Sequence, residues 1–237
     1  MDSEQTNLEQ QIKINFKNKE LLKEALTHRS YLNENPKWSA HHNERLEFLG
    51  DAVLELIVTE NLFKQYPQSP EGELTSIRAA LVNYQILSKI AKEIGLDKAI
   101  YLSKGEAKDS DRAKETILAN AFESLIGAIY LDKGYEISAK FIVENVLKFV
   151  PEIVEKKLYK DPKSLLQEII QEKLKITPTY EVIGETGPDH NKIFEVGVYF
   201  EGQFAGQGKG FSKQEAEIDA AKDALSKLSH ENHKRIT

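Results

Sequence analysis

The sequence predicts an all-α domain followed by a small domain with the element order α-β-β-β-α. Up to about residue 156, apolar residues recur at intervals of three and four, which is the period of amphipathic helices. After about residue 178 they alternate with polar or small residues, which is the period of half-buried strands. We therefore expect one domain over 1–156, a linker over 157–161, a second domain over 162–229 and a polar tail over 230–237.

Apolar stripes mark the helices of the first region. Three are clear from the spacing: Leu21, Leu22, Ala25 and Leu26; Leu46, Leu49, Val53, Leu56 and Ile57; and Ile117, Ala121, Leu125 and Ala128. Turn-forming residues such as Asn35-Pro36, Tyr66-Pro67 and Gly95 separate these helices. No stretch in this region alternates polar and apolar residues, so we expect helices alone.

The second region begins with a helix over about 162–174. Pro162 suits the first position of a helix, where a backbone N–H would have no partner in any case. Alternation then predicts three strands, with turns at Gly187-Pro188-Asp189 and at Gly202. Ser212 and Glu215 have the spacing of a capping box and predict where the last helix begins.

The composition limits the classes of protein. The chain has 237 residues, 40% hydrophobic and 30% charged, which is typical of globular proteins rather than of disordered or membrane proteins. It has no cysteine, which excludes disulfides and cysteine nucleophiles and favours a reducing compartment. The N-terminus is polar, unlike a signal peptide, and no apolar run reaches the roughly 18 residues of a membrane span. We therefore expect a cytoplasmic protein that does not contact membranes.

The net charge of −6 argues against a nucleic-acid-binding protein, because phosphate contacts need lysine and arginine. One explanation is a cluster of metal-binding carboxylates, which makes a protein acidic until its cations are bound. The sequence contains such a candidate cluster on two of the predicted helices.

Four carboxylates recur three or four residues apart and form one stripe along a predicted helix: Glu44, Glu47, Asp51 and Glu55. On a later helix, Asn120 and Glu123 lie one turn apart among small residues, which allow two helices to approach closely. A solvated acidic face is the simpler interpretation of the first stripe. Oxygen ligands from two packed helices would instead suit Mg²⁺ or Mn²⁺.

The stretch Asn43–Asp51, NERLEFLGD, and the residues after it resemble the signature of the ribonuclease III family. Three further segments match the family in order: Leu26 to Tyr31, Glu71 to Leu74, and Ile117 to Gly134. The resemblance implies a Mg²⁺-dependent endonuclease, in which Mn²⁺ can substitute, that cuts double-stranded RNA. It also implies a homodimer with two sites in one valley, leaving 5′-phosphate and 3′-hydroxyl ends with short 3′ overhangs.

The family pattern implies a role for each matching residue. Four residues would hold the metal: Glu47, Asp51, Asn120 and Glu123. Of these, Asp51 and Glu123 would be catalytic. Glu44 would lie at the rim of the valley, and Glu71 would help to bind metal or to position RNA. Phe48 would insert into the partner subunit, whereas a phenylalanine on such a helix would otherwise belong to the core.

The family usually has aspartate at the position of Asn120, so this residue is a departure. Asparagine keeps a carbonyl oxygen that can bind a hard cation, but it loses the negative charge. Three interpretations stay open: a natural variant with a weaker or water-mediated ligand, an engineered change that traps substrate, or an inactive relative that only binds RNA. The acidic residues that remain favour activity: Glu44, Glu47, Asp51, Glu71 and Glu123.

Residues from about Pro162 to Leu228 resemble a double-stranded-RNA-binding domain, which reads the shape of the A-form duplex. By the family pattern, seven residues would contact RNA: Ser164, Gln167, Glu168, Gln171, His190, Lys209 and Lys213. From residue 160 to residue 229 there are nine lysines and twelve acidic residues, a net charge of −3. We therefore expect weak, salt-sensitive RNA binding by this domain alone.

The two domains together predict an endoribonuclease that processes ribosomal, messenger and other precursor RNA. The alternative is a catalytically silent protein that binds double-stranded RNA with the same two domains. A metal-dependent cleavage assay on a perfect RNA duplex separates the two hypotheses.

Overall fold

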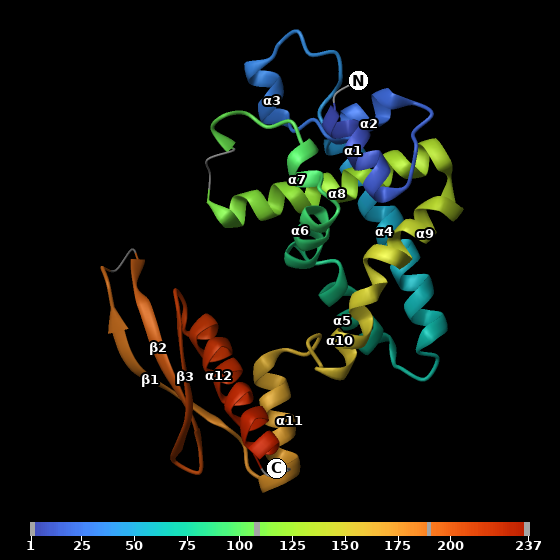
Figure 1. The fold of residues 1–237 in the computed structure, drawn as a ribbon. Coiled ribbons are helices and arrows are strands. Elements are labelled where there is room, and N and C mark those ends of the chain that lie inside the picture. The colour runs from blue at the N-terminus through green and yellow to red at the C-terminus, as the bar shows by residue number, and fades with distance from the viewer. Residues whose placement is uncertain (1–2, 107–109, 189–190, 235–237) are drawn as a thin grey trace. The chain divides into compact units, whose positions relative to one another are not determined.

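The computed structural model describes residues 3–106, 110–188 and 191–234. The chain forms two compact units, Met1–Tyr159 and Lys160–Thr237, each of which is described by itself (Figure 1). The boundary between them falls inside the linker expected over 157–161. The first unit is helical and the second is built from three strands and two helices, which confirms the predicted fold class. Within the described ranges, no helix is both long and apolar enough to cross a membrane.

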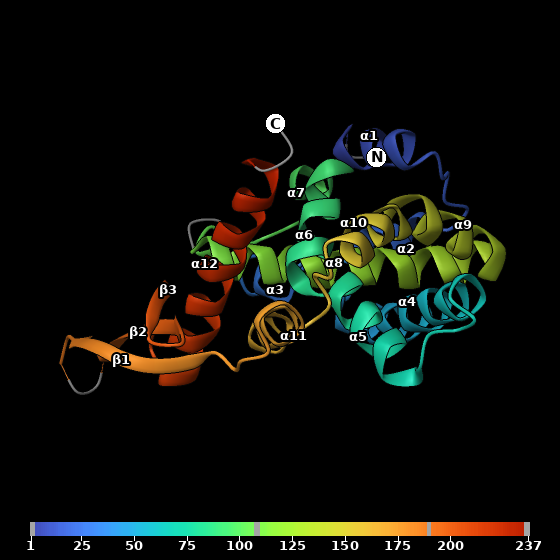
Figure 2. The same cartoon turned by 90° about the horizontal axis from the view of Figure 1, so that it is seen from below.

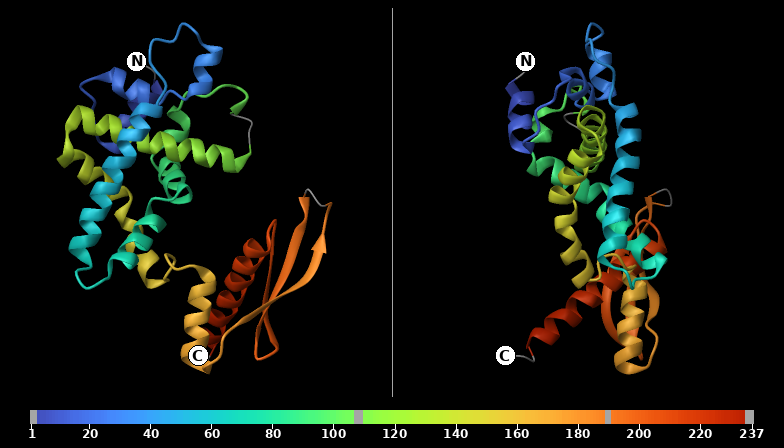
Figure 3. Two further views of the ribbon diagram at one scale, coloured as in Figure 1. Left: turned by 180° about the vertical axis from the view of Figure 1, so that it is seen from behind. Right: turned by 90° about the vertical axis from the view of Figure 1, so that its right-hand side faces the viewer.

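The first unit is built from helices of very different length. They are α1 (Ser3–Ile12), α2 (Lys19–Ala25), α3 (Arg29–Glu34), α4 (Glu44–Gln65), α5 (Glu71–Leu81), α6 (Tyr84–Glu93), α7 (Leu96–Ala99), α8 (Asp111–Lys133), α9 (Tyr135–Asn145) and α10 (Val150–Glu155). The two longest, α4 and α8, cross at the centre of the unit (Figure 3). Their buried side chains, such as Leu54 and Phe122, form the middle of the core. The acidic and small residues singled out in the sequence lie on these two helices.

One face of α4 is not part of the core. Phe48 is 82% exposed, Leu56 58% and Phe63 70%, and together with Ala52 they form an apolar stripe along the helix. The sequence assigned Leu56 to the buried stripe, and this assignment was wrong. Ile57, which belongs to the same predicted stripe, is fully buried as expected. Helical spacing shows where apolar residues cluster, but it does not tell a core face from a face that another chain could cover.

The second unit is a three-stranded antiparallel sheet with two helices on one face (Figure 1). Its elements are α11 (Pro162–Leu174), β1 (Thr179–Thr186), β2 (Ile193–Phe200), β3 (Gln203–Gly210) and α12 (Lys213–Lys234), and the strand order is β1-β2-β3. The core is small and consists of eight buried side chains: Leu166, Ile170, Val196, Val198, Ala216, Ala220, Ala221 and Ala224. The predicted bounds of α11 agree with the structure.

The ends of these elements follow from their sequence. The Asp161 carboxylate accepts from the Ser164 N–H (3.0 Å), and Pro162 follows the cap. Glu201 and Gly202, both with positive φ, form the tight turn between β2 and β3. Ser212 Oγ accepts from the Glu215 N–H (3.1 Å), as predicted for a capping residue.

The last helix is longer than predicted. The polar tail expected over 230–237 is instead helical as far as Lys234. Residues 226–234 contain no proline or glycine that would end a helix, so α12 continues through this polar segment.

A regular set of hydrogen bonds holds α12 along the outer edge of β3 (Figure 2). Three carboxylates, four residues apart on the helix, each accept from an N–H: Glu215 from Phe211 (2.9 Å), Asp219 from Lys209 (3.0 Å) and Asp223 from Gln207 (2.9 Å). Four helical residues rise about 6 Å and two strand residues about 6.6 Å, so the two spacings nearly match. We call these three residues the edge carboxylates.

Candidate active site

The candidate site is built where α4 and α8 cross in backbone contact. A Cβ atom on Gly50 would overlap the carbonyl oxygen of Glu123 and would lie 2.9 Å from the Gly127 nitrogen. A Cβ atom on Gly127 would likewise overlap the carbonyl oxygen of Leu46. Only glycine fits at both positions, so this pair sets how closely the two acidic helices approach.

Hydrogen bonds at the start of α4 hold the same crossing. Asn43 is buried, and its backbone N–H donates to the carbonyl of Thr27 (2.9 Å). Its side-chain amide donates to the carbonyl of Ala25 (3.4 Å), and its own carbonyl accepts from Ser124 Oγ (3.2 Å). Asn43 therefore ties α4 to the end of α2 and to α8, directly beside Glu123. Sequence reasoning did not assign this role, because Asn43 at a helix start reads as an ordinary cap.

Three of the predicted ligands act on one another at the crossing. Burial, together with the charges of Asp51, Glu47 and Glu55, raises the pKa of Glu123 to about 8. Burial also raises the pKa of Glu47, with contributions from Glu44 and Asp51. The structure therefore brings Glu47, Asp51 and Glu123 into one electrostatic group.

This donor set fits a hard divalent cation. The group consists of carboxylate oxygens, which Mg²⁺ and Mn²⁺ prefer, and a bound cation would relieve the repulsion that keeps a proton on Glu123. In the described part of the chain, no three carboxylate, imidazole or thiol groups converge closely enough to hold an ion as they stand. Binding would thus require the carboxylates to turn toward one another.

The remaining predicted site residues lie at different distances from this group. Asn120 is half-buried on α8, one turn before Glu123. Glu44 is exposed at the start of α4, where its carboxylate is 3.3 Å from Arg29 and 3.6 Å from His42. Burial lowers the pKa of His28, which is also close enough to Glu44 to be affected by its charge. These basic groups surround Glu44 at the rim of the site.

Glu71 lies apart from the three central carboxylates. It begins α5, accepts from Thr75 Oγ1 (3.2 Å) and lines a pocket of about 440 Å³ with Leu62, Phe63 and Leu74. None of the three central carboxylates lines this pocket. The structure therefore does not bring Glu71 to the crossing of α4 and α8.

Arg78 is a charged residue near the site that the sequence did not single out. Its Nε is 2.8 Å from the carboxylate of Glu55, and it also donates to Thr59 Oγ1 (2.8 Å). Arg78 therefore neutralises Glu55, the member of the predicted acidic stripe to which the sequence assigned no role. No sequence signal could have found this pair, because it depends on how α5 packs against α4.

The predicted RNA-binding residues of the second unit lie on its surface. Ser164, Gln167, Glu168 and Gln171 are exposed on α11, and Lys209 and Lys213 are exposed on β3 and α12. Several already have partners: Glu168 pairs with Lys160, Lys209 lies 3.4 Å from Glu195, and Lys213 lies 5.9 Å from the centre of the Phe194 ring. His190 lies outside the described residues.

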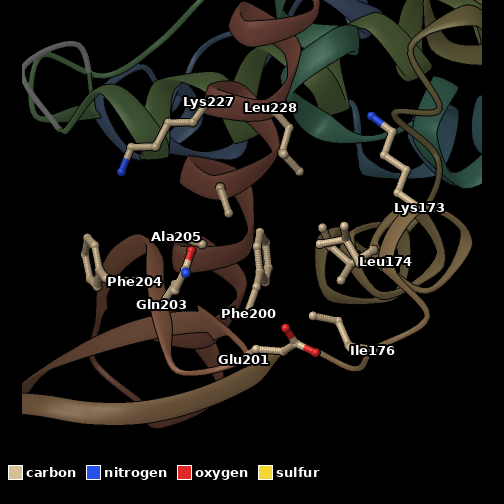
Figure 4. A pocket seen from close by; sticks show the side chains of 12 residues that line it. Lys173, Leu174, Ile176, Phe200, Glu201, Gln203, Phe204, Ala205, Lys227 and Leu228 are labelled. Carbon is tan, nitrogen blue, oxygen red and sulfur yellow. The ribbon is translucent and has the colours of Figure 1, made fainter.

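One pocket of the second unit lies apart from these residues. It has a volume of about 690 Å³ and lies between the end of α11, the turn after β2 and the second half of α12 (Figure 4). Leu174, Phe200, Phe204 and Leu228 line it together with Lys173 and Lys227. None of the predicted RNA-binding residues lines this pocket, so it is not part of the expected RNA surface.

Family models match both units. Residues 18–150 match the family described as ribonuclease-III-like, and residues 162–228 match the double-stranded RNA binding motif. The first match spans the crossing of α4 and α8, and the second spans all three strands and α11.

Full-length relatives support the same assignment. The chain is 44% identical to Ribonuclease 3 of Desulforamulus reducens over 96% of this chain and 92% of the relative. It is 46% identical to Ribonuclease 3 of Borreliella afzelii, over 93% of this chain and 90% of the relative. A solved nuclease domain of ribonuclease III from Campylobacter jejuni, described with structural flexibility in a region involved in dimer formation, is 41% identical to this chain, with a TM-score of 0.55. It covers 61% of this chain and 97% of that one.

Proposed function

Because this chain belongs to the ribonuclease III family and is an endoribonuclease that acts on double-stranded RNA, we propose that it hydrolyses phosphodiester bonds with Mg²⁺ at the crossing of α4 and α8. The observation that carries this proposal is the mutual electrostatic influence of Glu47, Asp51 and Glu123 on two helices in backbone contact. Carboxylates held this close without cationic partners are unfavourable unless a cation joins them.

The residues at the crossing would divide the work. Glu47, Asp51, Asn120 and Glu123 would hold the cation. A bound Mg²⁺ supplies a nucleophilic water near neutral pH and stabilises the departing oxygen of the phosphodiester. Asp51 and Glu123 would act closest to the reacting phosphate, and Glu44 would orient the RNA from the rim. Attack of water on phosphorus with loss of the 3′ oxygen gives a 5′-phosphate and a 3′-hydroxyl.

We propose that two copies pair through the apolar stripe of α4. One face of the helix that carries Glu47 and Asp51 exposes three large apolar side chains, Phe48, Leu56 and Phe63. Large exposed apolar patches of this kind mark surfaces at which proteins interact. Phe48 and Phe63 are nearly equidistant in sequence from Leu56. Antiparallel pairing about Leu56 would bring Phe48 of one copy to Phe63, beside the pocket that Glu71 lines. Such a dimer would offer one site to each strand of a duplex and leave short 3′ overhangs.

The second unit would hold the duplex for the first. Its exposed polar residues on α11, with Lys209 and Lys213, would contact ribose hydroxyls and phosphates. Ribosomal and messenger precursor RNAs are the substrates we propose, and the cytoplasmic location stays a prediction. The catalytically silent alternative rests on Asn120 alone.

A single assay tests the proposal. Cleavage of a perfect RNA duplex is measured against Mg²⁺ concentration for the parent and for Glu123→Ala. We expect Mg²⁺-dependent cleavage by the parent, 5′-phosphate ends, and almost none by the variant, while both bind the duplex equally in EDTA. Cleavage by Glu123→Ala at the parent rate would place the site elsewhere, and a parent that binds but never cleaves would support the silent alternative.

A further inference from the structure

The second unit contains a lysine that faces inward instead of toward solvent. Lys163 lies in the first turn of α11, one residue before Ser164, where a lysine would ordinarily be taken for a phosphate contact. Its ammonium is instead 2.5 Å from the carboxylate of Glu217 on α12 and 4.9 Å from the centre of the Tyr180 ring on β1. Lys163 therefore joins α11, β1 and α12 at one point.

This cluster lies between the two groups of residues proposed to contact RNA. Ser164 and Gln167 follow Lys163 on α11, and Lys213 lies one turn before Glu217 on α12. The side chains of Lys163 and Glu217 are 35% and 29% exposed, so solvent screens their attraction less than that of a surface pair. An ion pair at this place fixes the N-terminal ends of both helices relative to each other.

The surroundings make the pair hard to replace by other contacts. The Tyr180 hydroxyl is buried, and the described residues offer it no hydrogen-bond partner. Burial and the nearby charges of Glu217 and Asp161 raise the pKa of Tyr180 to about 12, so the hydroxyl stays neutral and cannot balance another charge. Without Lys163, the carboxylate of Glu217 would be left uncompensated one helical turn from Lys213.

We propose that Lys163 is a positioning residue for RNA binding. It holds the first turn of α11 and the start of α12 at the spacing that a duplex requires, and it neutralises Glu217 beside Lys213. Its ammonium does not contact a phosphate. This inference rests on the proposed RNA contacts of α11 and Lys213, and the experiment below tests those contacts separately.

The test compares four full-length proteins: the parent, Lys163→Met, Lys213→Met and the double variant Lys163→Met/Glu217→Met. Their affinity for a perfect RNA duplex is measured in EDTA over a series of KCl concentrations. The duplex is longer than the about 16 base pairs that such a domain spans. Each lost phosphate contact reduces the slope of log affinity against log salt by about one. Thermal unfolding of each variant shows whether the second unit is folded.

Lys163→Met should weaken RNA binding about tenfold and leave the slope of log affinity against log salt unchanged. A tenfold change corresponds to a coupling energy of ordinary size between neighbouring charged residues. The double variant should bind within about twofold of the parent, because apolar side chains of similar length can replace a partly buried ion pair. Lys213→Met should weaken binding and reduce the slope by about one.

The proposal is overturned if Lys163→Met reduces the slope as Lys213→Met does, or if the double variant binds as weakly as the single one. It is also overturned if Lys163→Met is folded and binds like the parent. Should Lys163→Met unfold, the double variant alone decides, since its affinity and slope distinguish a positioning role from a phosphate contact. If Lys213→Met alone has no effect, the proposed contact of Lys213 with RNA is wrong. The inference on Lys163 is then decided by the affinity and the salt slope of Lys163→Met.

Discussion

Glu123 illustrates how a single side chain links the stability of the protein to its proposed activity. Its carboxyl has a pKa of about 8 because it is largely buried next to Asp51 and Glu47. In the unfolded chain the same group titrates near its ordinary value, so the folded protein binds the extra proton between roughly pH 4.5 and pH 8. The group that we propose as a metal ligand is therefore a source of instability while no metal is present.

Replacing Glu123 by glutamine should stabilise the metal-free protein in a pH-dependent way. Because the folded pKa is raised, the stability of the parent falls as pH rises from about 4.5 through 8, and glutamine removes this loss. In EDTA, the melting temperature of Glu123→Gln should exceed that of the parent at pH 8.5 and match it near pH 4.5. A difference that is the same at every pH would mean that Glu123 does not carry the shifted titration.

Asn120 provides the second prediction at this scale. Asn120→Asp adds a negative charge one turn before Glu123 and restores the acidic residue usual in the family. Mg²⁺-dependent cleavage should be maintained or raised, and the Mg²⁺ concentration for half-maximal rate should fall, because a charged ligand attracts the cation more strongly. Titration of Mg²⁺ under single-turnover conditions measures both quantities, and a higher half-maximal concentration would show that Asn120 is not near the cation.

At the scale of elements, the site depends on the contact between α4 and α8 more than on any one carboxylate. Gly50 and Gly127 bring the backbones together, and Asn43 and Ser124 hold them in register. The contact explains why glycine occurs in the middle of a long helix, where it costs about 1 kcal/mol relative to alanine. The close packing of the two helices offsets this cost, and the same approach brings Asp51 near Glu123.

Gly50→Ala should separate the two helices. Its methyl group would overlap the Glu123 carbonyl, so we expect a loss of about 1–3 kcal/mol in the free energy of unfolding, or more, together with loss of cleavage. Gly72→Ala is the matched control, because a methyl group there meets no atom within 4 Å in a helical position. The control should gain up to about 1 kcal/mol. Equal effects of both substitutions in urea denaturation would contradict the role of the contact.

The sequence predicted those features that depend on neighbours along the chain. Pro162 predicted the start of α11, and the spacing of Glu44, Glu47 and Asp51 predicted one acidic face on a helix. Features that depend on packing were beyond its reach. The pairing of Glu55 with Arg78 requires knowing how α5 lies on α4, and the bonds of Asn43 require the positions of α2 and α8. Leu56 was misplaced because a core face and an exposed apolar face have the same spacing.

At the scale of the whole molecule, two units with separate cores divide the predicted metal ligands from the predicted RNA-binding residues. The first contains every predicted metal ligand, and the second contains every predicted RNA-binding residue of the double-stranded-RNA-binding domain. The acidity of the second unit becomes understandable from its structure. Four of its carboxylates accept hydrogen bonds from backbone N–H groups: Asp161, Glu215, Asp219 and Asp223. Part of the acidity of this unit therefore serves its fold, and each of these carboxylates keeps its charge.

The first unit should cleave RNA on its own. A chain ending at Tyr159 keeps its core and the crossing of α4 and α8, but it loses the contacts that hold the duplex. We expect cleavage at low ionic strength, and loss of cleavage at a lower salt concentration than for the full chain, since fewer protein–phosphate contacts remain. A folded first unit without cleavage at any salt concentration would show that the site needs the second unit.

Phe48→Glu should convert the proposed dimer to monomers. The charge would be buried at the proposed interface, which costs far more than placing it in water. Phe211→Glu is a suitable control, because Phe211 is likewise an exposed phenylalanine (66%) but lies in the other unit. Sedimentation velocity should show monomers for Phe48→Glu only, and its cleavage should change from double-strand cuts to slow nicks. A variant that still sediments as a dimer would place the interface elsewhere.

The edge carboxylates have a consequence for proteins that bind close together on one RNA. The last strand of a sheet presents free backbone groups on which a strand of another molecule can add, and repeated addition leads to fibres. Along β3 and just after it, the N–H groups of Gln207, Lys209 and Phe211 are already bound by α12. On β1, the register shift between Val182 and Gly184 interrupts the opposite edge. Both outer edges of the sheet are therefore capped or interrupted, so we expect copies of this unit bound close together on one long RNA not to join edge to edge.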